Sequence, residues 1–148
     1  EEARRKEQER QAAIREEQLR EEQLRKEGQK FQSAREMFEN EDILFEFDSA
    51  SLSIEAQEIL RAKAAWLREN PRAQVIIEGN CDERGTNEYN LALGDRRSGA
   101  VKSCLMKKGI ARERLIAISY GKEKPAVAGR TEKDRAKNRR AHFVIEER

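Results

Sequence analysis

The sequence predicts an α+β domain with a mixed four-stranded sheet and helices on one side, preceded by a long charged helix. Two observations lead to this fold class. Residues 1–30 are mostly Glu, Arg, Lys and Gln, whereas the apolar residues gather from Phe31 onward. After residue 40, short apolar runs alternate with segments whose apolar residues recur at helical spacing. Their order is strand, helix, strand, helix, strand, strand, which is typical of one mixed sheet covered by helices.

Residues 1–39 are predicted to form one charged helix that serves as a tether or spacer. At several places along it an acidic residue precedes a basic one by four positions, which stabilises a helix by about 0.3 kcal/mol per pair. Leu24, Phe31 and Phe38 keep the seven-residue spacing of a coiled coil, but the two preceding positions of that register are charged. We therefore expect a solvated tether, and a homodimer formed through this helix is the alternative.

The predicted domain covers residues 40–148 and begins with a strand at 43–47, Ile-Leu-Phe-Glu-Phe. Turn-forming residues follow it at 48–51. Ser53 can cap the next helix, which Asn70 and Pro71 end. The remaining elements are predicted, in chain order, as a strand at 75–77, a helix from residue 87 to a left-handed cap at Gly109, a strand at 115–119, a polar connection at 121–140 and a strand at 141–145.

Charge and composition exclude some classes of function. The formal net charge is only +2 and both signs are interleaved, so the sequence does not predict binding to nucleic acid. No apolar run reaches the ~20 residues of a membrane span. No signal peptide is present, and Glu1 is expected to be the cut end of a mature or trimmed chain.

The two cysteines are not expected to form a disulfide. Cys81 follows a predicted strand and Cys104 lies near the end of the next helix. Their separation along that helix is on the order of 24 Å, whereas a disulfide needs Cα atoms within roughly 7 Å. Free thiols are typical of a reducing compartment.

Arg97 stands out because it lies on the apolar side of a predicted helix. It follows Leu93 by four residues and precedes Val101 by four, so the three share one face. A buried guanidinium needs a partner, or it costs several kcal/mol. One interpretation is an internal salt bridge to Asp82 or Asp48. The other is that Arg97 lines a pocket and binds the carboxylate of a ligand.

Asp82 favours the second interpretation. It follows the carboxyl end of a strand, where ligands of open α/β sheets usually bind. Gly85 permits a tight turn there. Asp48, with Phe47 beside it, follows the end of the first strand in the same way. Two acids and one arginine at one edge of the sheet predict a site for an ammonium group next to a carboxylate.

Catalysis, metal binding and cofactor binding are not predicted. No nucleophile has an identifiable base and orienting partner. Cys81, Asp82 and His142 lack the spacing of metal ligands. Residues 79–85 do not have the pattern of a phosphate-binding loop.

Several segments resemble the OmpA-like domain family, in the form found in peptidoglycan-associated lipoproteins (Pal). Residues 79–86 read Gly-Asn-Cys-Asp-Glu-Arg-Gly-Thr, and residues 89–97 read Tyr-Asn-Leu-Ala-Leu-Gly-Asp-Arg-Arg. Residues 45–48, 119–125 and 137–141 are similar to further segments of that family. The resemblance extends over about residues 42–146 in the family's order.

The resemblance implies specific roles for residues of this chain. Asp82 would take the amine, and Arg97 the carboxylate, of the diaminopimelate in a peptidoglycan stem peptide. Asn80 departs from the family pattern, which has histidine there. Asparagine keeps hydrogen-bonding groups but has no ring to pack. The other implied peptidoglycan-binding residues are Phe47, Asp48, Gly85, Thr86, Leu93, Asn138 and Arg139.

The implied function is non-covalent, non-catalytic binding of peptidoglycan. A lipid anchor upstream of Glu1 would hold the protein on the periplasmic side of the outer membrane of a Gram-negative bacterium. The resemblance further implies the Tol-Pal system, with TolB as a partner, and a part in cell division. The alternatives are an OmpA-like domain of another envelope assembly, such as a stator or a dimeric scaffold, and a hydrolase that acts on the cell wall.

Overall fold

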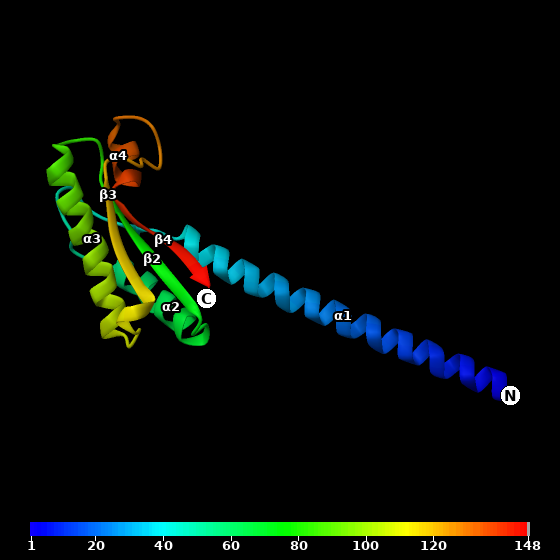
Figure 1. The fold of residues 1–148 in the computed structure, drawn as a ribbon. Helices are drawn as coiled ribbons and strands as arrows, with labels where there is room; N and C mark the ends of the chain where they lie inside the picture. Colours follow the sequence, from blue (N-terminus) through cyan, green and yellow to red (C-terminus); the bar gives the residue numbers. More distant parts are fainter. Residues whose placement is uncertain (148) are drawn as a thin grey trace. The chain divides into compact units, whose positions relative to one another are not determined.

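The computed structural model describes residues 1–147, whose course is shown in Figure 1. The chain forms two compact units, residues 1–37 and a second unit that begins at Phe38. Helix α1 (Glu2–Asn40) makes up the first unit, and its last three residues belong to the second. Its exposed side chains form ion pairs one turn apart, such as Arg10 with Glu7. None of the helices in residues 1–147 has the length and apolarity of a membrane span.

The second unit contains the predicted mixed four-stranded sheet. Its strands lie in the order β1-β4-β2-β3. The pair β2–β3 is parallel, whereas β4 runs antiparallel to both of its neighbours. The α+β fold class is confirmed. The strands are β1 (Ile43–Leu44), β2 (Ala73–Asn80), β3 (Leu115–Gly121) and β4 (Arg140–Glu147).

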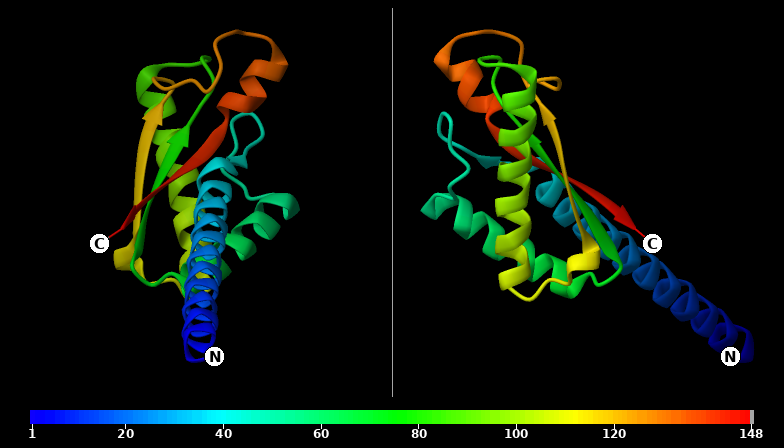
Figure 2. Two further views of the ribbon diagram at one scale, coloured as in Figure 1. Left: turned by 90° about the vertical axis from the view of Figure 1, so that its right-hand side faces the viewer. Right: turned by 60° about the vertical axis from the view of Figure 1, so that its left-hand side comes forward.

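Helices α2 (Ile54–Glu69) and α3 (Asn87–Lys107) cover one side of the sheet, as Figure 2 shows. Alternate strand residues face these helices and fill the core, because successive side chains of a strand point to opposite faces. Ser53 caps α2 as predicted: its Oγ accepts a hydrogen bond from the Ala56 amide at 3.0 Å. Fully buried core residues from strands and helices alike include Ile43, Leu60, Leu67, Val75, Ile77, Val101, Leu105 and Phe143.

Two glycines bring α3 unusually close to the sheet. A Cβ atom at Gly79 on β2 would lie 1.9 Å from the carbonyl oxygen of Gly94 on α3. A Cβ atom at Gly94 would lie 2.0 Å from Ser119 Oγ on β3. The contact at Gly79 is with backbone, so only glycine fits there, whereas the contact at Gly94 is with a side-chain hydroxyl. The contact positions Arg97, one turn further along α3, beside the carboxyl end of β2.

Lys63 on α2 is buried where the second unit begins. Its side chain lies between two rings, with Nζ 4.4 Å from the centroid of Phe38 and 4.1 Å from that of Phe143. Its ammonium donates a hydrogen bond to the carbonyl of Phe38 in the last turn of α1. Helix ends leave such carbonyls without intrahelical partners, so Lys63 caps the end of α1.

Two parts of the fold differ from the sequence prediction. The predicted strand at 43–47 is wrong beyond Leu44: the Phe45 amide still donates a hydrogen bond to the Arg139 carbonyl at 2.9 Å, but the chain then turns, with Asp48 in a left-handed conformation at φ 54°. The predicted polar connection contains helix α4 (Glu132–Asn138). Thr131 and Asp134 start α4 with a capping box, in which the side chain of each residue accepts a hydrogen bond from the backbone amide of the other. A single 3₁₀ turn (Arg112–Arg114) also precedes β3.

Candidate functional site

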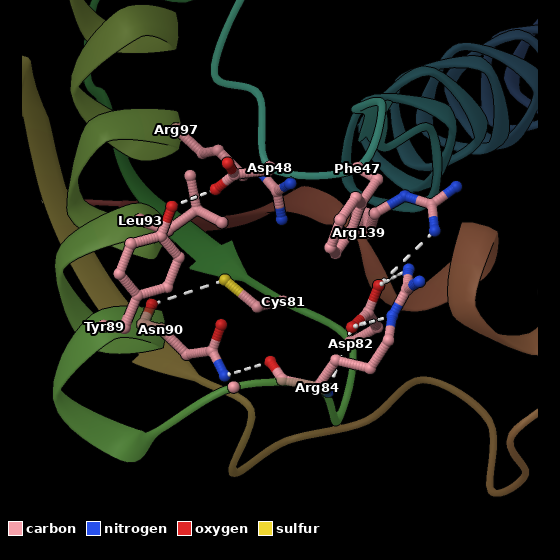
Figure 3. A pocket seen from close by; sticks show the side chains of 11 residues that line it. Phe47, Asp48, Cys81, Asp82, Arg84, Tyr89, Asn90, Leu93, Arg97 and Arg139 are labelled. Carbon is pink, nitrogen blue, oxygen red and sulfur yellow. Dashed lines mark hydrogen bonds and ion pairs between the residues drawn. The ribbon is translucent and has the colours of Figure 1, made fainter.

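A pocket of about 240 Å³ lies at the carboxyl end of β2, between the turn after β1 and the start of α3 (Figure 3). Most of the predicted site residues line it: Phe47, Asp48, Asp82, Gly85, Leu93, Arg97 and Arg139. The sequence analysis did not assign the other four lining residues to the site: Cys81, Arg84, Tyr89 and Asn90. The structure thus brings together residues that are up to 92 positions apart, from Phe47 to Arg139.

Thr86 and Asn138 do not line this pocket. Thr86 caps α3, since its Oγ1 accepts a hydrogen bond from the Tyr89 amide at 3.2 Å. Asn138 holds the loop before α4: its Oδ1 accepts hydrogen bonds from the amides of Ala126 at 2.7 Å and Val127 at 3.1 Å. It lines a neighbouring pocket instead. In this structure both residues have local structural roles.

Arg97 is fully buried, as its position on α3 predicted, but its partners were not foreseen. Nε donates to the carbonyl of Ser49 at 2.8 Å, Nη1 to that of Asn80 at 2.9 Å and Nη2 to that of Glu46 at 3.1 Å. It forms no ion pair with any carboxylate of residues 1–147, so the alternative interpretation of Arg97, an internal salt bridge to Asp82 or Asp48, is wrong. Burial lowers the pKa of Arg97, because the charged form loses hydration.

These three carbonyls explain how Arg97 shapes the pocket. Two of them belong to the turn after β1 and one to the end of β2, so the guanidinium ties the turn that carries Phe47 and Asp48 to the sheet. A guanidinium has five N–H groups. One N–H on each terminal nitrogen is therefore left over from these bonds, and Figure 3 shows the side chain reaching from α3 toward Asp48.

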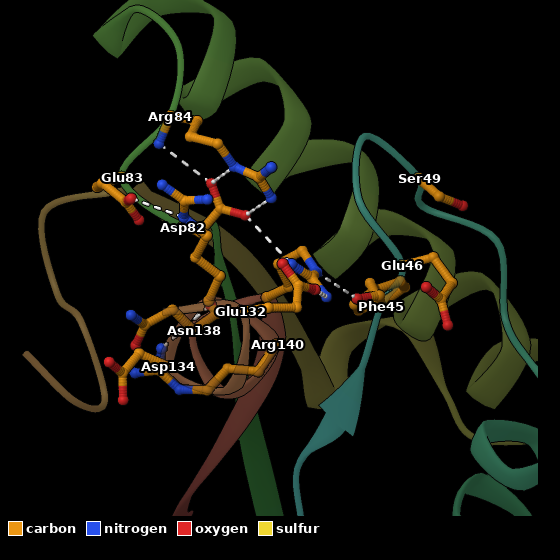
Figure 4. Close-up of polar contacts among 12 residues, drawn as sticks. Phe45, Glu46, Ser49, Asp82, Glu83, Arg84, Glu132, Asp134, Asn138 and Arg140 are labelled. Atoms are coloured by element: carbon orange, nitrogen blue, oxygen red, sulfur yellow. Dashed lines mark hydrogen bonds and ion pairs between the residues drawn. The ribbon is translucent and has the colours of Figure 1, made fainter. Parts of the chain in front are cut away.

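Asp82 is 4% exposed, and arginines surround its carboxylate (Figure 4). Oδ1 accepts hydrogen bonds from the Arg84 amide at 3.1 Å and from Arg84 Nε at 3.2 Å. Oδ2 pairs with Arg84 Nη2 at 2.8 Å and with Arg139 Nη1 at 3.4 Å. Burial by itself raises the pKa of Asp82, but the hydrogen bonds from Arg84 and Arg139 outweigh it and the pKa is lowered. Asp82 is therefore ionised at neutral pH.

Arg139 is as deeply buried as Asp82 and connects three elements. Besides Asp82, its guanidinium binds the carbonyl of Phe45 through Nε at 2.9 Å and Glu132 Oε1 on α4 through Nη2 at 2.9 Å. It therefore fixes the end of β1, the start of α4 and the Asp82 carboxylate relative to one another.

The mouth of the pocket carries aromatic side chains. The guanidinium carbon of Arg84 lies 3.9 Å from the ring centroid of Phe47, within the range of a cation–π contact. Across the pocket, the Tyr89 hydroxyl donates a hydrogen bond to Asp48 Oδ1, which raises the pKa of Tyr89. Tyr89 lies one turn before Leu93 on α3, so helical spacing was a signal that could have placed it in the site.

Cys81 and Asn90 shape the turn between β2 and α3. The Cys81 thiol donates to the Asn90 carbonyl at 3.3 Å, and Asn90 Nδ2 donates to the Arg84 carbonyl at 2.8 Å. Burial raises the pKa of Cys81, which keeps it a thiol. Gly85 has φ 96°, a left-handed conformation that favours glycine. Cys81 and Cys104 are both free.

Asn80, the residue that departs from the family pattern, is buried at the end of β2. Its Nδ2 donates to the Glu78 carbonyl at 3.0 Å, whereas its Oδ1 has no hydrogen-bond partner among the described residues. Within those residues no cluster of three or more His, Cys, Asp or Glu side chains could hold a metal ion. The pocket offers two aspartates, three arginines and two aromatic rings, which suits a ligand that carries both charges.

Comparisons with known proteins identify the family of this chain. The model of the OmpA family matches residues 44–139. The peptidoglycan-associated lipoprotein of Haemophilus influenzae is 52% identical over 99 residues, covering 67% of this chain and 65% of that protein. That of Legionella pneumophila is 41% identical over 107 residues, covering 72% of this chain and 61% of that protein. The chain thus spans less than two thirds of the length of these relatives.

Solved structures show the same similarity. The crystal structure of the peptidoglycan-associated lipoprotein from Burkholderia pseudomallei superposes with a TM-score of 0.69 at 43% identity, covering 71% of this chain and 89% of that one. The C-terminal domain of Helicobacter pylori MotB superposes with a TM-score of 0.68 at 19% identity, covering 73% and 85%, and shares the fold alone. The resemblance expected from the sequence is confirmed: with the family model matching more than half of its residues, this chain belongs to the OmpA family.

Proposed function

We propose that this protein binds peptidoglycan non-covalently, by gripping the diaminopimelate of a stem peptide. The observation that carries the proposal is the pocket in which Asp82, ionised and nearly buried, lies near the fully buried Arg97. The far end of a diaminopimelate side chain carries an ammonium and a carboxylate on one carbon. Asp82 would bind the ammonium, and the two remaining terminal N–H groups of Arg97 would bind the carboxylate.

The pocket can also exclude ligands that lack one of these charges. A lysine side chain offers the ammonium without the carboxylate, and so would leave the Arg97 donors unpaired. A site built to hydrogen-bond a polar group discriminates strongly against an analogue that lacks it. Phe47, Asp48 and Leu93 would contact the aliphatic part of the ligand at the mouth of the pocket, and Gly85 would bring backbone close to it. Thr86, Asn138 and Arg139 would support the site from its rim.

The relatives support a role at the cell envelope. The three relatives described above that are 41%, 43% and 52% identical to this chain are named peptidoglycan-associated lipoproteins. By this similarity the protein would act as a Pal-like lipoprotein of the Tol-Pal system, held by an upstream lipid at the periplasmic side of the outer membrane, with TolB as a partner. Helix α1 would be the tether between anchor and domain. This role is one of binding and needs no catalysis.

Calorimetric titration with two muropeptides tests the proposal. One carries diaminopimelate and the other carries lysine at the same position of the stem peptide. We expect binding to the first, at least tenfold weaker binding to the second, and loss of binding in Asp82→Asn. Asp95→Asn is the matched control, because Asp95 is exposed on α3. Absence of binding to either peptide by the folded wild-type protein would refute the function.

Arg97 needs a variant that respects its structural bonds. Arg97→Ala would leave three backbone carbonyls without their donor, so lost binding could reflect a displaced turn. Arg97→Lys keeps the charge but loses the planar fork. We expect it to weaken binding of the diaminopimelate peptide while the two-dimensional NMR spectrum retains the folded pattern. Unchanged affinity in Arg97→Lys would remove Arg97 from the ligand-binding role.

A further inference from the structure

The partners of the Asp82 carboxylate fall into a fixed set and a releasable set. The fixed partners are the Arg84 amide, which is part of the turn, and Arg139, whose side chain is 5% exposed and held by two further acceptors. The releasable partner is the Arg84 side chain, which is 33% exposed. Once Arg84 swings away, Asp82 therefore keeps two donors and stays ionised.

The Arg84 guanidinium occupies the place that a ligand's cation needs. Its Nε lies 3.2 Å from Oδ1 and its Nη2 lies 2.8 Å from Oδ2, so it spans both oxygens of Asp82. An ammonium that binds the same carboxylate from the pocket meets this guanidinium first. On its outer side Arg84 contacts the ring of Phe47, which is itself 58% exposed. A cation–π contact at an exposed site holds it weakly.

Displacement of Arg84 changes the charge balance of the pocket. Asp48 and Asp82 face Arg84, Arg97 and Arg139, and within residues 1–147 Asp82 is the carboxylate with which Arg84 forms an ion pair. A ligand that carries only an ammonium displaces the Arg84 guanidinium from the Asp82 carboxylate and offers it no new carboxylate. A ligand that carries a carboxylate beside the ammonium avoids this loss. Its ammonium pairs with Asp82, and its carboxylate pairs with the displaced Arg84 guanidinium.

We propose, on the basis of the function inferred above, that Arg84 is an internal competitor that sets the ligand specificity of the pocket. The ligand's ammonium replaces the Arg84 guanidinium on Asp82, and the released guanidinium binds the ligand's carboxylate together with Arg97. Arg84 thereby selects ligands with an ammonium and a carboxylate on the same carbon over those with an ammonium alone.

Affinities of Arg84→Gln for the same two muropeptides test this inference. The substitution removes the competitor and also the extra partner for the carboxylate. The lysine peptide should bind roughly three- to tenfold more tightly than it binds wild type, because the competitor is partly exposed and its loss is worth about one ordinary hydrogen bond. The affinity for the diaminopimelate peptide should rise by less than this or should fall. The ratio of the two affinities therefore becomes smaller than in wild type. Arg61→Gln is the matched control, because it removes one charge from an exposed pair on α2.

A second measurement does not depend on the stability of the variant. In the wild-type protein, the Arg84 Nε–H resonance should shift when the diaminopimelate peptide is added, because its acceptor changes. The Arg139 Nε–H, which donates to the Phe45 carbonyl, should stay in place. An unmoved Arg84 signal in the bound state, or an unchanged preference in folded Arg84→Gln, would overturn the competitor role and leave the proposed function intact. Failure of wild type to bind the diaminopimelate peptide would remove both.

Discussion

Alanine substitutions at two glycines of α3 should have opposite effects on stability. A Cβ atom at Gly99 meets nothing within 4 Å, so Gly99→Ala changes only the helix propensity. It should stabilise the protein by up to about 1 kcal/mol. A Cβ atom at Gly94 would lie 2.0 Å from Ser119 Oγ and 3.0 Å from the Gly79 carbonyl oxygen. Gly94→Ala gains the same propensity, but it must either push α3 away from the sheet or turn the Ser119 hydroxyl aside, which breaks the hydrogen bond that Oγ accepts from the Gly121 amide.

The cost of Gly94→Ala follows from how far α3 has to move. The new Cβ needs about 1 Å more space, since non-bonded carbon and oxygen atoms rarely approach within ~3 Å. Such a shift would lengthen the 2.9 Å bond from Arg97 Nη1 to the Asn80 carbonyl beyond hydrogen-bond range. Overpacking costs ~1–3 kcal/mol, and a lost charged hydrogen bond costs ~1.5–3 kcal/mol. After the propensity gain, we expect a net loss of about 1.5–5 kcal/mol.

Urea denaturation followed by tryptophan fluorescence measures both effects. The single tryptophan, Trp66, lies on α2 in the second unit and reports on the unfolding of the domain. The denaturation midpoint should fall in Gly94→Ala and rise in Gly99→Ala, with unchanged slopes. Equal stabilities of the two variants would show that the close packing of α3 on the sheet does not constrain Gly94, and the reasoning would fail.

Two further predictions concern pH. Burial lowers the pKa of Lys63 from 10.5 to about 8, with Glu41 and Asp42 partly opposing it. Between those pH values the unfolded chain binds a proton that the folded protein does not, so the free energy of unfolding should rise with pH by up to roughly 3 kcal/mol. Urea midpoints at pH 7.5 and 10 measure this rise. A rise of the same size in Lys63→Met would contradict the assignment to Lys63. The pKa of His142 is raised, chiefly by its hydrogen bond to Asp42. The stabilisation that results should be present in full below 6.5, the pKa in the unfolded chain, and should be lost as pH rises through the pKa in the folded protein. NMR titration should find this pKa lower in Asp42→Asn, and an unmoved titration would exclude the pair as its cause.

Much of the fold could be predicted because it depends on local periodicity. The buried position of Arg97 followed from its spacing between Leu93 and Val101 on one helix face. Helix α4 was missed although Thr131 and Asp134 have the spacing of a capping box, because a helix of seven residues has too short an apolar pattern to detect. No periodicity reveals the early end of β1 at Leu44 or the left-handed conformation of Asp48 in the turn that follows.

The candidate site was predictable in its members but not in its bonds. Asp82 and Arg97 could be placed at one edge of the sheet, whereas their partners depend on segments far away in the chain. Arg97 donates to carbonyls 48 and 51 residues away, and Arg139 reaches Asp82 across 57 residues. Backbone carbonyls carry no sequence signal, so an arginine that binds them cannot be distinguished from one that awaits a ligand. Arg84 was missed as a site residue because a charged residue in an exposed turn is ordinary.

The cap that Lys63 places on the end of α1 has a mechanical consequence. A tether is useful only if the domain can bear the force that is applied through it. Here that force would enter the domain at Phe38, whose ring is packed against Trp66 and Phe143 and whose carbonyl is held by a buried ammonium. The sequence has no glycine or proline between Gly28 and Pro71. Within the second unit, the load would therefore be shared at once by several buried contacts around Phe38, all of which must break before this residue is pulled out.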